Sequence, residues 1–319
     1  MNSQKIITIQ KGDYSAQINL SRGANCIRLR NKKYGATILR EPDYSKELDN
    51  PYLYGMPILF PVNRISGGEF EFEGRRYRFP INEPKTGCHL HGMLHEMEFS
   101  INKVSDSEVC CSYCATKDEP YLTFPHEFEI RMTYEIKEDG FYHTVEVLNH
   151  SSENMPVMLG FHTTFLARFI EENKAESVRV FADIIEEYER NMENYLPSGI
   201  KPQFDSTSKA LCQGTFDPFK EPTSRHYRSS AMGRMIIHDE VRNLSLVYEN
   251  DEKYGFRLIY NGNADEYICM EPQNCLANCM NSPFSREEAG VDNIEPGKTK
   301  RYHSKIYIQE GTHTAPTFL

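Results

Sequence analysis

Hydrophobic and polar residues alternate with a period of two along most of this chain, in short runs separated by Gly, Asn and Asp. This pattern predicts a mainly β protein built from antiparallel strands. The clearest case is a hairpin in which residues 128–136 lead to Asp139-Gly140, a strong two-residue turn signal, and residues 141–147 return. Charged and aromatic residues also alternate over 69–79, which predicts a second hairpin with one face in water.

Further strands are expected near residues 235–238, 244–248, 256–260, 267–271 and 302–308. The stretch from about 169 to 232 departs from this pattern, because residues 184–190 favour a short helix and Leu196-Pro197-Ser198-Gly199 a turn. This stretch is neither Gly/Ser-rich nor of low complexity, so we interpret it as an ordered excursion of the kind that often carries binding residues. Strands flank it and no long repeat occurs, so residues 1–319 are expected to form a single domain.

The composition narrows the functional classes. Lys and Arg number 36 and Asp and Glu 46, which gives a net charge of −10, the wrong sign for a surface that neutralises phosphates. Nucleic acid and anionic membranes are therefore excluded as primary partners. Neither a signal-peptide pattern nor a membrane-length apolar run occurs, so a cytoplasmic protein is expected. The nine scattered cysteines favour reduced thiols, and a zinc site at Cys111/Cys114 or Cys275/Cys279 is less favoured.

The first candidate for chemistry is a pair of histidines, His89 and His91. On an extended strand they would lie on one face, roughly 7 Å apart, and both could reach one ligand. Gly92 would let a substrate approach the backbone. Two other interpretations stay open: a solvated His-rich turn, or a cupin-like site in which these histidines and Glu96 hold a divalent metal. The second cupin motif is missing, because no histidine closely follows the Pro-Ser-Gly at 197–199.

Two further candidates lie on apolar strands. Alternation over 157–165 places His162 opposite the bulkier apolar side chains and beside Gly160, although a lone strand histidine is often a satisfied core residue. Glu271 ends an apolar run just before Pro272, where burial would raise its pKa toward that of a useful general base. The alternative for Glu271 is a salt-bridged glutamate at a strand end.

Asn63 and Arg64 follow an apolar run and complete the set of candidates. The guanidinium of an arginine presents a fixed fork of donors that suits hydroxyls and carboxylates. Trp is absent, so stacking against a sugar ring would fall to Tyr and Phe.

Taken together and in this order, these segments resemble the aldose 1-epimerase (galactose mutarotase) family. The resemblance extends from about residue 18 to residue 308. Its motifs are Pro57-Ile58-Leu59-Phe60-Pro61 with Asn63-Arg64-Ile65, Gly68-Glu69-Phe70, Gly74-Arg75-Arg76-Tyr77, Leu90-His91-Gly92, His162-Thr163-Thr164-Phe165, Leu196-Pro197-Ser198-Gly199, Glu271-Pro272-Gln273 and residues 290–297.

The resemblance implies a large antiparallel β-sandwich, often called a supersandwich, with a sugar cleft on a concave face and no metal or organic cofactor. The family interconverts the α and β anomers of a free aldose such as glucose or galactose. Glu271 resembles the general base that takes the proton of the C1 hydroxyl, and His162 resembles the general acid that protonates the ring oxygen. The expected partner is thus a small sugar, and the chain is expected to be a monomer or a homodimer.

The resemblance also implies substrate-binding residues. Arg64 resembles the arginine that fixes the sugar hydroxyls, and the nearby Asn63 and His89 are counted with it as substrate-binding candidates. His91 is counted with Glu271 and His162 as a catalytic residue, because it resembles a histidine that hydrogen-bonds the sugar near the reacting oxygens. The family also uses an aspartate, for which Asp217 is the candidate; Asp205 is a weaker one.

Two alternative functions remain open. A sugar-phosphate epimerase of the same fold would need a basic cluster, which Arg64, Arg75, Arg76 and Arg78 could supply. A solvated charged face explains Arg76 and Arg78 equally well, because alternation places both on one face of a strand. The other alternative is a carbohydrate-binding or sensing protein without catalysis.

Overall fold

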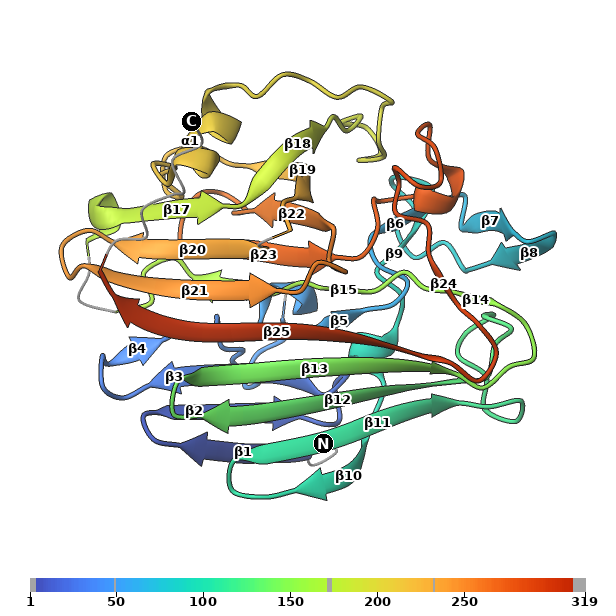
Figure 1. Cartoon of the computed structure of the whole chain (residues 1–319), viewed down its shortest axis with the longest axis horizontal. Coiled ribbons are helices and arrows are strands. Elements are labelled where there is room, and N and C mark those ends of the chain that lie inside the picture. Colours follow the sequence, from blue (N-terminus) through green and yellow to red (C-terminus); the bar gives the residue numbers. More distant parts are fainter. Residues whose placement is uncertain (1–3, 49, 171–173, 232, 312–319) are drawn as a thin grey trace.

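The computed structural model describes residues 4–48, 50–170, 174–231 and 233–311, and they form a mainly β, antiparallel structure (Figure 1). The front layer in Figure 1 is an eight-stranded sheet. Its order is β10 (Ser100–Val104), β11 (Glu108–Ala115), β12 (Phe128–Lys137), β13 (Gly140–Asn149), β25 (Thr299–Glu310), β21 (Leu244–Asn250), β20 (Arg234–Asp239) and β17 (Val178–Ala182).

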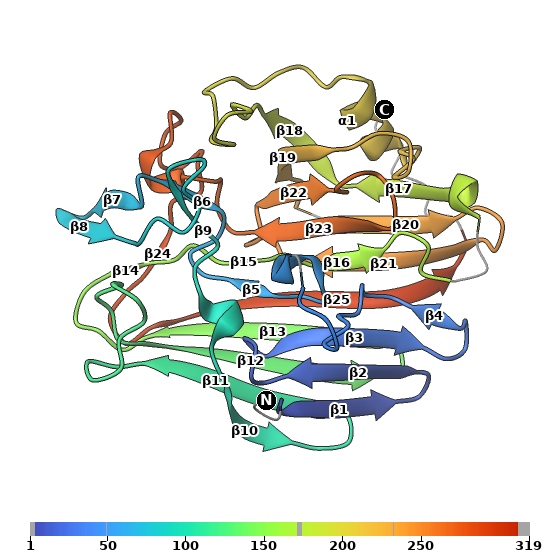
Figure 2. The ribbon, with the colours of Figure 1, turned by 180° about the vertical axis from the view of Figure 1, so that it is seen from behind.

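The second layer is seen from behind in Figure 2 and consists of a seven-stranded sheet above a four-stranded one. The seven-stranded sheet has the order β18 (Ile184–Tyr188), β19 (Ser224–Ser229), β22 (Phe256–Tyr260), β23 (Tyr267–Gln273), β15 (Gly160–Phe161) and β5 (Ile58–Leu59), with β16 (Thr164–Leu166) also paired to β23. The four-stranded sheet contains β1 (Ile6–Lys11), β2 (Tyr14–Asn19), β3 (Asn25–Asn31) and β4 (Ala36–Thr37).

Smaller elements complete the fold. Three strand pairs are β6 (Arg64–Ser66) with β9 (Cys88–Leu90), β7 (Glu69–Phe72) with β8 (Arg75–Arg78), and β14 (Met155–Pro156) with β24 (Asn293–Ile294). The helical elements are α1 (Ser206–Gln213) and the 3-10 turns η1 (Pro51–Leu53), η2 (Leu94–Glu96), η3 (Ala175–Ser177) and η4 (Cys279–Asn281). Among the described residues, no helix is long and apolar enough to cross a membrane.

The core lies between the two layers. Along β12 every second side chain is buried, among them Ile130, Met132 and Tyr134, as the alternation predicts. The hydroxyl of Tyr134 donates to the carbonyl of Ala24, 2.7 Å away, and so ties the eight-stranded sheet to the four-stranded one. The Thr163 and Tyr248 hydroxyls, 3.2 Å apart, connect it to the seven-stranded sheet.

Both expected hairpins and all five further strands are confirmed, with one shift of a turn. The hairpin of β12 and β13 turns at Glu138-Asp139, because Gly140 already pairs with Lys137. The expected helix over 184–190 is wrong, since residues 184–188 form strand β18. A bulge between Ile184 and Glu186 breaks the alternation there, which hid the strand. The expected turn at 196–199 is also wrong: the turn spans residues 192–194, and Pro197 forms a β-bridge with Arg190.

Candidate active site

A carboxyl group and an imidazole meet where β23 pairs with the short strands of the second layer. Glu271 lies on β23, and His162 directly follows β15. His162 Nε2 is 3.2 Å from Glu271 Oε1, within ion-pair distance but without the alignment of a hydrogen bond. The other oxygen, Oε2, accepts a hydrogen bond of 3.2 Å from Gln273. Asn63 in turn donates to the amide oxygen of Gln273 at 3.3 Å, so a chain of side chains orients the carboxyl group.

Burial shifts the two pKa values in opposite directions. Glu271 is 1% exposed, and burial raises its pKa to about 8, against the opposing effects of Arg190 and the Gln273 hydrogen bond. Burial lowers the pKa of His162 to about 4. Between about pH 4 and pH 8 the pair therefore holds one proton. A pair that can both donate and accept one proton at neutral pH is suited to acid–base catalysis.

His91 joins this pair from a different direction than expected. The ring centroids of His91 and His162 are 5.7 Å apart in an edge-to-face arrangement, and Tyr52 of η1 packs against His91 at 4.8 Å. Strand β9 ends at Leu90 and His91 has a φ of +62°, so the expected extended strand through both histidines is wrong. His89 instead lies against Phe79, with Nδ1 2.7 Å from a backbone carbonyl.

Gly92 allows the backbone next to His91 to pack closely against Phe60. A Cβ atom at this position would lie 1.9 Å from the carbonyl oxygen of Phe60 and 2.7 Å from the Tyr121 hydroxyl. Tyr121 donates to that carbonyl and accepts a 2.7 Å hydrogen bond from the amide of Met93. The backbone next to Gly92 is thus filled by Phe60, and the expectation that a substrate approaches there is replaced by a structural role.

Two arginines flank the ring of Tyr195. Arg64 on β6 makes a bidentate ion pair with Glu83, with both hydrogen bonds 2.7 Å long, and its guanidinium lies 4.7 Å from the centre of the Tyr195 ring. The guanidinium of Arg190 lies 5.6 Å from the same ring centre. Arg190 donates to the backbone carbonyl of Ser224 and, at 2.6 Å, to its hydroxyl.

Arg190 was missed from the sequence, and so was His226. Register pairing aligns Tyr188, His226, Leu258 and Glu271 across β18, β19, β22 and β23, so their side chains share one face of the sheet. Among the described residues, neither ring nitrogen of His226 has a hydrogen-bond partner. Arg190 lies two residues after the end of β18, a position that the helical interpretation of residues 184–190 concealed.

The structure places the two candidate aspartates at α1, each with partners of its own. Asp217 accepts a 2.9 Å hydrogen bond from the amide of Phe219 and lines a cavity of about 330 Å³. Asp205 caps α1 through a 3.0 Å hydrogen bond from the amide of Ser208, and it pairs with Arg225 at 2.7 Å. Neither aspartate forms a hydrogen bond or an ion pair with Glu271 or His162.

The arrangement of the described residues does not support the cupin-like metal site considered for His89, His91 and Glu96. Glu96 faces His95 at 3.7 Å and is half exposed. Over residues 4–48, 50–170, 174–231 and 233–311, no three His, Cys, Asp or Glu side chains are arranged to hold a metal ion.

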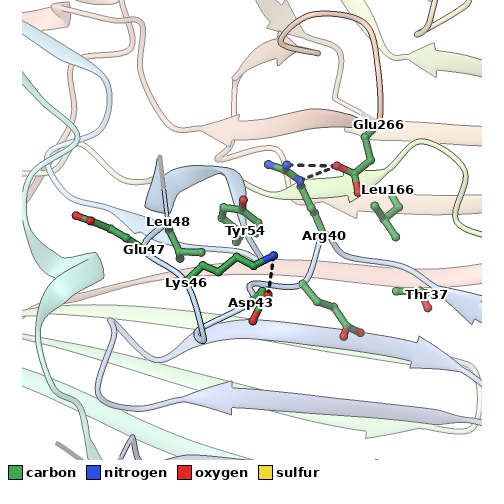
Figure 3. A pocket seen from close by; sticks show the side chains of 10 residues that line it. Thr37, Arg40, Asp43, Lys46, Glu47, Leu48, Tyr54, Leu166 and Glu266 are labelled. Atoms are coloured by element: carbon green, nitrogen blue, oxygen red, sulfur yellow. Dashed lines mark hydrogen bonds and ion pairs between the residues drawn. The ribbon is translucent and has the colours of Figure 1, made fainter. Parts of the chain in front are cut away.

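A cavity of about 450 Å³ lies next to η1 (Figure 3). In it Arg40 is stacked between the rings of Tyr54 and Tyr267, at 4.4 and 4.6 Å, and pairs with Glu266 at 3.3 Å. Lys46 pairs with Asp43, three residues before it on the same loop, at 3.6 Å (Figure 3). Because both basic side chains that line this cavity among the described residues already have acidic partners, it offers no unpaired cation to a ligand.

The fold is that of galactose mutarotase-like proteins. A galactose mutarotase-like protein from Clostridium acetobutylicum superposes with a TM-score of 0.90 and 28% sequence identity, over 97% of this chain and 98% of that one. The sequence profile of the aldose 1-epimerase family matches residues 5–307, and the chain belongs to this family.

Two proteins of Escherichia coli (strain K12), both described as uncharacterised, are similar over part of their length. YphB is 25% identical over 109 residues, which are 34% of this chain and 36% of YphB. YihR is 28% identical over 107 residues, which are 34% of this chain and 33% of YihR. The match to these relatives thus spans about a third of each protein.

Proposed function

We propose that this protein is an aldose 1-epimerase that interconverts the α and β anomers of a free aldose. The observation that carries the proposal is the buried contact of 3.2 Å between His162 and Glu271, a pair that holds one proton across neutral pH. Anomer exchange needs one proton removed and one added at a single acetal-like centre, which such a pair supplies. Membership of the aldose 1-epimerase family supports the same reaction.

The proposed reaction opens and recloses the sugar ring. One member of the pair takes the proton of the C1 hydroxyl while the other gives a proton to the ring oxygen, and the bond between C1 and the ring oxygen breaks. Rotation about C1–C2 turns the other face of the aldehyde toward the ring hydroxyl. Reclosure reverses both proton transfers, so each residue acts once as acid and once as base.

The resting position of the proton follows from the two shifted pKa values. At neutral pH the proton is on Glu271 and the imidazole of His162 is neutral. The family resemblance assigns the base to the carboxylate and the acid to the imidazolium, and that form contains the same number of protons. One proton transfer across the 3.2 Å contact therefore converts one form into the other.

His91 and Arg64 are proposed to orient the sugar. His91 Nδ1 is buried without a hydrogen-bond partner among the described residues, which leaves it free to bind an oxygen of the substrate. Burial keeps the pKa of His91 well below its ordinary range, so the ring is neutral and can accept a hydrogen bond from a hydroxyl group. Arg64 is held in place by Glu83, and its charge acts on both His91 and Glu271.

The test is polarimetry of freshly dissolved α-D-glucose and α-D-galactose with and without the purified protein. Glu271→Gln and His162→Asn are each expected to lower kcat by about 10²–10⁴-fold, the usual contribution of general acid–base catalysis. Glu129→Gln, which alters an ion-paired glutamate on β12 of the other layer, is the matched control and is expected to keep the wild-type rate. Wild-type rates in both site variants would refute the mechanism.

The alternative of a sugar-phosphate epimerase finds no support at the β7–β8 hairpin. Arg75 is paired with Glu153, and Arg78 lies 3.5 Å from Glu69. These arginines therefore do not form the free basic cluster that a phosphate would need.

A further inference from the structure

Among the described residues of this site, the guanidinium of Arg190 is a positive charge without an ion-pair partner. Its side chain is 8% exposed, and its hydrogen bonds go to the neutral carbonyl and hydroxyl of Ser224. Burial, and then the nearby Arg64, lower its pKa to about 10, so the group is still protonated at neutral pH. A buried charge without a partner is unfavourable and is usually matched by an opposite charge.

A count of charges around Tyr195 gives one uncompensated positive charge. Arg64 is neutralised by Glu83, whose pKa the hydrogen bonds from Arg64 and Thr86 hold below its usual range despite partial burial. Within the part of the chain that the structure describes, no carboxylate lies within ion-pair distance of Arg190. Glu271 acts on Arg190 electrostatically, but it is mostly protonated at neutral pH.

His226 adds a second unsatisfied group next to Arg190. The residue is fully buried, both its ring nitrogens lack partners among the described residues, and burial followed by the charge of Arg190 lowers its pKa to about 3. It shares a sheet face with Glu271, two strands away, which is roughly 10 Å at the usual strand spacing. This distance is within reach of a C6 substituent on a hexose bound at Glu271 through C1 and its ring oxygen.

We propose that the substrate of this epimerase is an aldose that carries one carboxylate, a uronate, and that Arg190 and His226 bind this carboxylate. The inference rests on the proposed epimerase function and names its substrate class. A single carboxylate matches the single uncompensated charge, whereas a phosphate ester carries nearly two negative charges. The planar fork of an arginine also fits the two oxygens of a carboxylate. His226, in the neutral form, can donate one hydrogen bond from its ring N–H to the same group.

The experiment compares D-glucuronate and D-galacturonate with D-glucose, D-galactose and D-glucose 6-phosphate. With the wild-type protein, kcat/KM for a uronate is expected to exceed that for the matching neutral sugar by about 10-fold or more, because hydrogen bonds to charged groups are worth more than neutral ones. In Arg190→Gln this ratio is expected to fall to about one, mainly through a higher KM for the uronate. Arg190→Lys keeps the charge and should retain part of the preference.

Arg131→Gln on β12 is the matched control, since this arginine is ion-paired in the other layer and should leave both the rate and the ratio unchanged. A wild-type protein that turns over neutral sugars as well as uronates would overturn the substrate inference and leave the epimerase proposal standing. A preference for glucose 6-phosphate over both uronates would likewise overturn it. Both wild-type outcomes are readable even where Arg190→Gln fails to fold.

A binding measurement separates the two proposals. Calorimetric titration of the wild-type protein and of Arg190→Gln with galacturonate and galactose reports binding without turnover. Binding of galacturonate that depends on Arg190, with no acceleration of anomer exchange, would support the carboxylate site and refute the epimerase. Absence of both binding and turnover for every sugar would overturn both proposals.

Discussion

Two pairs of strands differ in length and in role. One pair is β12 and β13 of the eight-stranded sheet, and the other is β15 and β16 of the seven-stranded sheet. β12 and β13 pair without interruption from Phe128 and Asn149 to Lys137 and Gly140, with every second side chain of β12 in the core. β15 and β16 contain two and three residues, and the chain between them carries His162. The long strands bury apolar surface, while the short ones hold polar groups in place.

The two regions differ in the chemistry of their unsatisfied groups. Among the described residues, buried side-chain atoms without hydrogen-bond partners occur in both layers, at His143 and Tyr302 in the eight-stranded sheet and at His162, His226 and Glu271 in the layer that holds the candidate site, but only in the second layer does such a carboxyl group lie beside an imidazole. Such groups destabilise a fold, and they persist where function requires them. We call the eight-stranded sheet the regular layer and the seven-stranded sheet with its short strands the polar layer. We infer that the apolar surface buried between the two layers offsets the cost of these unsatisfied groups.

The largest expected effect comes from the backbone beneath the polar layer. Gly92→Ala should lower the free energy of unfolding by about 3 kcal/mol or more, because a Cβ atom with φ of +63° would clash with the Phe60 carbonyl. It should also lower kcat/KM by displacing His91. Denaturant unfolding and polarimetry measure the two effects.

Gly87→Ala is the matched control for this substitution. Gly87 has a φ of +66° at the other end of β9, but nothing lies within 4 Å of its added Cβ. Its cost should be limited to the backbone conformation, about 1–2 kcal/mol, with activity retained. Equal losses of stability in the two variants would contradict the role assigned to the close contact at Phe60.

The pH dependence of kcat/KM tests the His162–Glu271 pair of the polar layer. Below about pH 4 His162 is protonated as well as Glu271, and the pair has no base. Above about pH 8 Glu271 loses its proton while His162 is neutral, and the pair has no acid. The enzymatic kcat/KM should therefore be bell-shaped, falling about tenfold per pH unit outside this window. A single ionisation near pH 6.5 would contradict the shifted pair.

The smallest expected effect tests the regular layer. Ile130→Val removes one methylene group from a fully buried position on β12 and should lower the free energy of unfolding by about 0.5–1.5 kcal/mol. Because β12 supplies no candidate site residue, kcat/KM should stay within experimental error of the wild type. A parallel fall in activity and stability would show that the two layers are coupled more closely than their contacts indicate.

The sequence predicts the regular strands of this protein better than it predicts the residues of the candidate site. The β12–β13 hairpin follows from strict alternation and a turn signal, and a carboxylate ending an apolar strand drew attention to Glu271. Arg190 and His226 could not be found this way. Their significance depends on the order β18-β19-β22-β23, which pairs segments whose adjacency no local pattern encodes. The bulge in β18 also removed the period on which the strand assignment relies.

Strand β25 has a consequence for how the protein is made. It lies between β13 and β21, pairing with β13 over residues 299–306 and with β21 over residues 304–310, so it joins the two halves of the eight-stranded sheet (Figure 1). A ribosome synthesises residues 299–310 long after β13 and β21 have emerged. Until then each of these strands exposes an edge of unpaired amides and carbonyls, which invites pairing with other chains. The incomplete chain is therefore exposed to such pairing until residues 299–310 have been synthesised, and a chaperone that covers these edges would protect it during that interval.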